Sequence, residues 1–133
     1  MANTTPIFTI TPRAGMVRIS TANTARDGTG TMGDVITGAT SGTRVDLGGR
    51  RIIKKTTAGM IRLFIYDGSA NVRAWKEIVV TAITVAASTA AFTSTLVTPD
   101  PSVPLLVLPN GYVLRASTHN AETFDVIAHG GDY

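Results

Sequence analysis

The stretch TTAGMIRLFIYDG, residues 56–68, decides the fold class of this chain of 133 residues. Residues typical of strands run through it, and the pair Asp67–Gly68 is a typical turn. Segments of the same kind recur at short intervals, and no stretch has the periodicity of an amphipathic helix. They cover residues 7–10, 16–21, 34–39, 50–56, 72–80, 92–97, 103–108, 112–118 and 123–129. The pattern predicts an all-β protein that is a sandwich or a barrel, and of these we expect an antiparallel β-sandwich of two sheets, as a jelly roll.

The domain organisation follows from the absence of any linker or break in composition. A chain of 133 residues suits one domain with one core. Pro6 and Pro12 favour an extended N-terminal arm over residues 1–13. Residues 81–94, TAITVAASTAAFTS, lack an apolar stripe, so we expect a long connection with at most one helical turn. The prediction is a single β-sandwich domain, residues 1–133, that begins with this arm.

The strand predicted at 60–66 would carry apolar side chains on both faces. An unpaired Arg62 is too costly to bury, and side chains alternate along a strand. The inner face carries Ile61, Leu63 and Ile65, and the outer face carries Met60, Arg62, Phe64 and Tyr66. An outer face this apolar is typical of an interaction surface. We expect another protein chain to cover it at least in part, the alternative being residues 81–94.

A shorter segment, AGMVRIS at 14–20, repeats the pattern of AGMIRLF at 58–64. The same alternation puts Met16 and Arg18 on an outer face, and the shared pattern allows the two strands to lie side by side. Both residues therefore join Met60, Arg62, Phe64 and Tyr66 as candidate protein-interface residues. The residues predicted to be largely buried are Val17, Ile19, Ile61, Leu63, Ile65, Val113 and Ala128.

Composition limits the classes of function. The chain has no cysteine, so it offers neither a disulfide nor a thiolate metal ligand. It has no apolar run long enough to span a membrane, and the start MANTTPIFTI does not resemble a secretory signal. The net charge is only +3. The densest basic run, GGRRIIKKT at 48–56, indicates an edge strand protected by charge rather than a nucleic-acid surface. We expect neither membrane nor nucleic acid as a partner.

No motif in the sequence predicts catalysis, a cofactor or a metal. GTGTMG at 28–33 matches a dinucleotide-binding pattern, but a predicted strand follows it where the pattern requires a helix. His119, Glu122, Asp125 and His129 do not have the spacing of a known metal motif. No nucleophile elbow accompanies the serines. We therefore predict that the protein is not an enzyme.

The segments AGMIRLFIYDG…VRAWKEIVV and LPNGYVLRASTHNAETFDVIAHGGDY, in a threonine-rich chain without cysteine, resemble small virion proteins of tailed bacteriophages. The likeness is greatest to capsid decoration, or cement, proteins and spans residues 35–133. It implies a jelly-roll or related sandwich that binds and stabilises the outside of the capsid. The implied partners are the major capsid protein lattice and other copies of the chain, as a dimer or trimer. The implied location is the capsid surface of the virion, after synthesis in the host cytoplasm.

Alternative functions remain open at this point. Neck, tail and head-fibre proteins of phages have a similar sequence character. A β-sandwich that binds carbohydrate or a receptor would use Trp75, Tyr66 and Tyr112 if these aromatic side chains share one exposed surface. An enzyme of another kind would need His119 or His129 in a concave pocket.

Overall fold

The computed structural model describes residues 11–38, 43–50, 55–56, 59–84, 86–89, 93–96 and 106–132. Every helix or strand in these ranges is a β-strand, which confirms the all-β prediction. The strands are β1 (Thr11–Ile19), β2 (Gly33–Thr37), β3 (Thr43–Arg50), β4 (Lys55–Thr56), β5 (Gly59–Tyr66), β6 (Val72–Val80), β7 (Ile83–Thr84), β8 (Thr93–Leu96), β9 (Leu106–Leu108), β10 (Val113–Thr118) and β11 (Phe124–Asp132).

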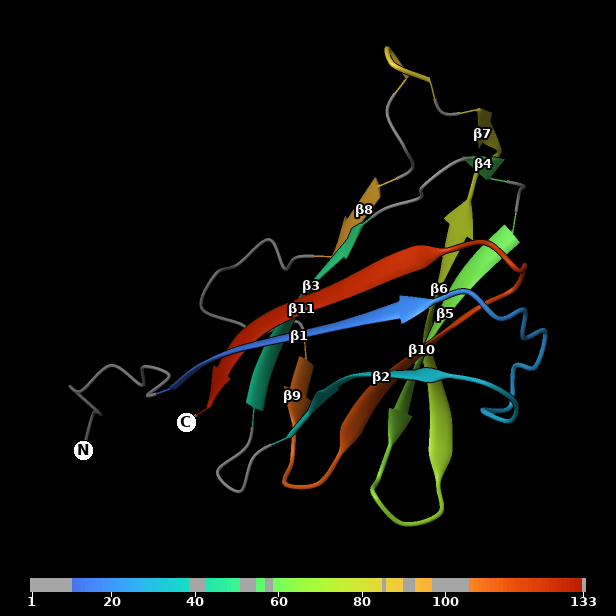
Figure 1. Cartoon of the computed structure of the whole chain (residues 1–133). Helices are drawn as coiled ribbons and strands as arrows, with labels where there is room; N and C mark the ends of the chain where they lie inside the picture. The colour runs from blue at the N-terminus through green and yellow to red at the C-terminus, as the bar shows by residue number, and fades with distance from the viewer. Residues whose placement is uncertain are drawn as a thin grey trace.

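Two antiparallel sheets hold most of these strands (Figure 1). Sheet A has the order β1-β11-β3-β8, and β9 pairs with β3 beside this path. Sheet B has the order β2-β10-β5-β6. The short strands β4 and β7 form a separate two-stranded ladder. Most neighbours within a sheet are far apart in sequence, so the fold depends on long-range pairing.

One apolar cluster joins the two sheets, so the arrangement is sandwich-like. Sheet A contributes Phe124, Val126 and Ala128 from β11, and sheet B contributes Leu63 from β5 and Leu114 from β10. Burial of this apolar surface is the main stabilising contribution. The predicted burial is confirmed for Ile19, Ile61, Leu63, Val113 and Ala128, whereas Val17 and Ile65 are only partly buried.

Strand β1 corrects the predicted N-terminal arm. It begins at Thr11 and pairs with β11 from Thr11↔Asp132 to Ile19↔Phe124, so residues 11–13 belong to a sheet. Residues 1–10 lie outside the described residues. Pro12 is tolerated because β1 is the last strand of sheet A, where one backbone edge needs no partner in the sheet.

Two glycine pairs, a dipeptide that is typical of turns, lie inside strands. Gly48 and Gly49 belong to β3 and pair with Ile127 and Val126, and Gly130 and Gly131 belong to β11. Long-range pairing between β3 and β11 overrides the local preference of glycine for turns. Gly68 and Gly111, by contrast, occupy turns with φ of 82° and 79°, where glycine is favoured.

The described parts of segment 81–94 form strands elsewhere in the fold. They contain no helix: β7 pairs with β4, and β8 pairs with β3 in sheet A. For these described parts, the predicted alternative cover for the outer face of β5 is wrong. A different segment takes this place.

Candidate functional site

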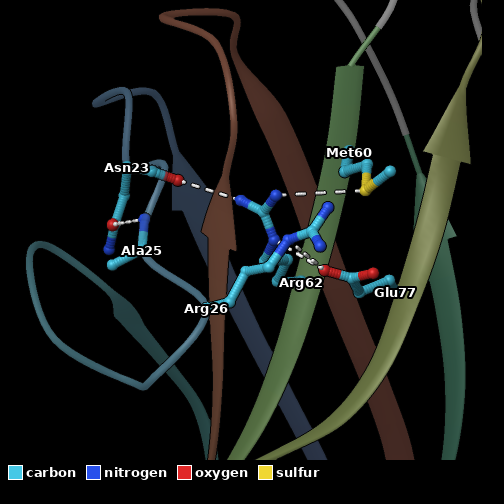
Figure 2. A network of polar contacts seen from close by, with 6 residues as sticks. All are labelled: Asn23, Ala25, Arg26, Met60, Arg62 and Glu77. Atoms are coloured by element: carbon cyan, nitrogen blue, oxygen red, sulfur yellow. Dashed lines mark hydrogen bonds and ion pairs between the residues drawn. The ribbon is translucent and has the colours of Figure 1, made fainter.

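The loop of residues 20–32, which connects β1 to β2, covers the outer face of β5. Near its start the Asn23 amide donates to the Thr118 carbonyl over 2.8 Å, and Arg62 Nη1 donates to the Asn23 carbonyl over 3.3 Å (Figure 2). Further along, the backbone at Gly28 touches Val72, since a Cβ there would lie 2.5 Å from Val72 Cγ1. The loop thus extends from the level of Arg62 on β5 to Val72, the first residue of β6.

Asn23 holds the shape of this loop. Its Nδ2 donates to the carbonyls of Thr29 and Thr31, each over 2.9 Å, and its Oδ1 accepts the Ala25 amide over 3.0 Å. Gly30 passes so close that a Cβ would lie 2.8 Å from the Asn23 amide group. Because Asn23 is buried with these bonds made, the 20–32 loop has an internal polar core in place of an apolar one.

Arg62 lies beneath the loop with a charged partner on the neighbouring strand. Its Nε is 2.8 Å from Glu77 Oε1, and its Nη2 lies 3.9 Å from Met60 Sδ (Figure 2). Arg26 reaches from the loop to the same Glu77 oxygen, 3.4 Å from its Nε. The hydrogen bond from Arg62 and the charges of both arginines hold the pKa of Glu77 below its usual value.

Phe64 is fully enclosed on the same face, at 0% exposure. Phe64 does not belong to the apolar cluster between the sheets, and neither does the buried Val113. Val113 pairs with Tyr66, which lies two residues after Phe64 and therefore on the same face of sheet B. Sheet B therefore buries apolar side chains on both faces.

The prediction that another protein chain covers this face is wrong for Arg62 and Phe64, because both are buried within the single chain and Arg62 bonds to the 20–32 loop. The argument assumed an unpaired arginine, and the pairing of β5 with β6 brings Arg62 opposite Glu77. A paired and hydrogen-bonded arginine can be buried, and the 20–32 loop supplies one of its acceptors, the Asn23 carbonyl.

Met60 and Tyr66 lie at the margins of the covered face and are partly buried. The Arg115 guanidinium lies 3.9 Å from the centre of the Tyr66 ring and forms an ion pair with Asp34 over 2.8 Å. The Tyr66 hydroxyl donates to the Ser69 carbonyl over 3.1 Å. Tyr66 is thus engaged within the chain on its ring face and at its hydroxyl. An interface role for Met60 and Tyr66 stays a prediction.

The outer face of sheet A is open where β1 and β11 pair. We call the side chains of three opposite pairs on this face the β1 patch: Ala14 and His129, Met16 and Ile127, and Arg18 and Asp125. Met16 is 73% exposed. Arg18 binds both carboxylate oxygens of Asp125, over 2.7 and 3.0 Å, and this contact raises the pKa of Arg18. A surface hollow of about 400 Å³ is lined by Met16, Val17, Arg18, Asp125 and Ile127.

The two strands with the shared Met-x-Arg pattern do not lie side by side. β1 belongs to sheet A and β5 to sheet B, so the six candidate interface residues form two separate groups. Met16 and Arg18 are exposed, and their interface role stays a prediction. The sequence argument missed Asn23, Glu77, Asp125 and Ile127, because their roles depend on which strands pair.

The residues proposed for carbohydrate binding do not share a surface. Trp75 and Tyr112 pack against the cluster between the sheets, whereas Tyr66 lies on the opposite face of sheet B. His129 is exposed on β11, and His119 follows β10 in the turn that leads to β11. Within the described ranges, no group of three or more His, Asp or Glu side chains could hold a metal ion.

No family model, no curated protein and no solved structure matches this chain. In the part of the chain that the structure describes, no helix is long and apolar enough to cross a membrane.

Proposed function

We propose that this protein is a non-enzymatic virion protein that binds the outer surface of a phage capsid and stabilises it. The proposal rests on the resemblance of the sequence to decoration proteins. The observation that carries it furthest is the strand order, which is the order expected of a jelly roll, a fold common among viral capsid proteins.

The jelly-roll reading follows from the eight strands that make up the two sheet paths. Taken in chain order they are β1, β2, β3, β5, β6, β8, β10 and β11. The first pairs with the last, the second with the seventh, the third with the sixth and the fourth with the fifth. This is the pairing of one long hairpin that is rolled up, which is how a jelly roll is built. The predicted N-terminal arm of residues 1–13 stays a prediction for residues 1–10, which lie outside the described residues.

The distribution of charge and apolar surface also supports a protein that binds another protein. The β1 patch combines exposed Met16 with the bidentate Arg18–Asp125 pair. Methionine and arginine are enriched at protein interfaces, and a broad sheet face suits a contact with a protein better than with a small molecule. The β1 patch is therefore the surface that we assign to protein contacts.

The test is co-expression with the major capsid protein of a phage whose genome encodes this chain. Sedimentation should carry the protein with the assembled shells, and the shells that contain it should disassemble at a higher temperature than bare shells. A protein that stays in the supernatant, with shells of unchanged stability, contradicts capsid binding. Its recovery in tail or neck fractions of purified virions would instead place it among those components.

A further inference from the structure

The β1 patch is complementary to itself. Across β1 and β11, Met16 lies opposite Ile127 and Arg18 lies opposite Asp125, so two of its three pairs are matched, one apolar and one of opposite charge. Met16 projects from the sheet at 73% exposure, and the hollow of about 400 Å³ lies directly beside it. The patch therefore contains both a projecting side chain and a depression that could receive one.

We propose that two copies of this chain pack face to face through the β1 patch, about a two-fold axis that runs along the strands between β1 and β11. Such an axis exchanges the positions of β1 and β11. It brings Met16 over the partner's Ile127 and Arg18 over the partner's Asp125, and each Met16 enters the partner's hollow. A contact of this kind is isologous, because the same surface is used by both copies.

A second copy fits this surface better than an unrelated partner. The surface that complements the β1 patch must present an apolar pair beside a charged pair of the same spacing, and the β1 patch itself meets this requirement under the two-fold operation. Sheets that stack face to face lie about 10 Å apart, a distance that side chains from two facing patches can fill. Each Arg18 could then share its charge between Asp125 of its own chain and the partner's Asp125.

The contact should be reversible. The β1 patch has six side chains, whereas a stable interface has about 20–30 residues on each side. The equilibrium between one and two copies is therefore expected to depend on protein concentration. This inference stands apart from shell binding, since the mass of the free protein can be measured without a capsid.

Sedimentation equilibrium of the purified full chain tests the inference. The apparent mass should rise with concentration from 13.9 kDa toward twice that value. Met16→Glu places a charge in the partner's hollow and should raise the dissociation constant about tenfold or more. Val79→Glu is the matched control, because Val79 is 66% exposed on β6 of sheet B, outside the patch, and the change should leave the dissociation constant unaltered.

A charge-exchange experiment identifies the symmetry. Arg18→Glu and Asp125→Arg should each weaken self-association, because each puts like charges opposite one another across the contact. A mixture of the two variants should associate again, since Glu at position 18 then meets Arg at position 125 of the other chain. Circular dichroism of each variant alone checks that the fold is kept. If Asp125→Arg does not fold, the milder pair Arg18→Gln and Asp125→Asn replaces it, and each should weaken association.

Three results would overturn the inference. The first is a mass of 13.9 kDa at every concentration. The second is an assembly of three copies, which a two-fold contact cannot produce. The third is self-association that Met16→Glu leaves as strong as in the unchanged protein.

Discussion

The segments AGMVRIS at 14–20 and AGMIRLF at 58–64 form strands with the same local chemistry in opposite surroundings. In both, the arginine Nε meets a carboxylate directly across the strand pair: Arg18 to Asp125 over 2.7 Å, and Arg62 to Glu77 over 2.8 Å. Yet the Arg18 side chain is 56% exposed and the Arg62 side chain only 4%. The difference in exposure arises outside the two segments, because the loop of residues 20–32, which follows β1, folds over Arg62 on β5.

The comparison shows that a Met-x-Arg strand face can serve as a surface or as a second core. Cross-strand pairing with a carboxylate makes the arginine suitable for both, since it provides the partner that a buried charge requires. Whether such a face becomes a surface or a second core then depends on whether another segment of the chain can close over it. The loop of residues 20–32 does so with few apolar side chains, by satisfying its own polar groups through Asn23.

The largest effect that separates the two faces should come from the apolar side chains. Phe64→Ala should lower the free energy of unfolding by about 3–5 kcal/mol, because Phe64 is fully buried and its removal leaves a cavity. Met16→Ala should change it by no more than about 0.5 kcal/mol, because Met16 is exposed. Leu63→Ala, in the cluster between the sheets, is expected to cost about 2–5 kcal/mol. It serves as the reference for a fully buried apolar side chain. Urea denaturation measures all three, and a Phe64→Ala cost near that of Met16→Ala would show that the outer face of β5 is not buried.

The same substitution at the two arginines should give the next largest difference. Arg62→Met keeps an apolar stem but removes the donors to Glu77 and to the Asn23 carbonyl, and should cost about 1–3 kcal/mol. Arg18→Met should change stability little, because both members of its pair can be hydrated. Thermal unfolding at low protein concentration compares the two without self-association. Equal losses would mean that the difference in exposure has no energetic consequence.

The strand content could be predicted from the sequence because alternation and turn residues are local signals. Residues 72–80 were predicted as a strand and form β6 with the same bounds, and the turn at Asp67–Gly68 is present. The sequence placed an edge strand at 48–56, whereas β3 covers Thr43–Arg50 and lies between β11 and β8, because the ladder with β11, remote in sequence, determines its position. The burial of Arg62 was not predicted for the same reason: no local pattern indicates that Glu77 lies opposite Arg62, or that residues 20–32 lie above it.

A smaller effect should identify what holds the loop in place. Asn23→Ala removes the amide that joins the loop to itself, and should lower global stability by about 1 kcal/mol while it opens the loop locally. Hydrogen exchange followed by mass spectrometry should show faster exchange in residues 20–32 and in β5. Thr24→Ala, an exposed change in the same loop, is the control and should leave exchange unaltered. Unchanged exchange in Asn23→Ala would mean that other contacts hold the loop.

The smallest effect concerns pH and isolates the charge of Glu77 from its shape. The folded chain holds the pKa of Glu77 below its usual value of 4.5, chiefly through the hydrogen bond from Arg62, so the charged form stabilises the fold. The stabilisation is fully present above the usual value and is lost as the pH falls through the lower, folded value. Glu77→Gln keeps the shape but cannot ionise, so it should be less stable than the unchanged protein at neutral pH, and the difference should shrink toward zero in acid.

The pKa of Asp67, lowered to about 2 by hydrogen bonds from Asn71 and Ser69, affects both proteins equally and cancels. Melting temperatures of the two proteins between neutral pH and pH about 3 measure the difference. A difference that stays constant across this range would show that the ionised carboxylate of Glu77 does not stabilise the buried Arg62.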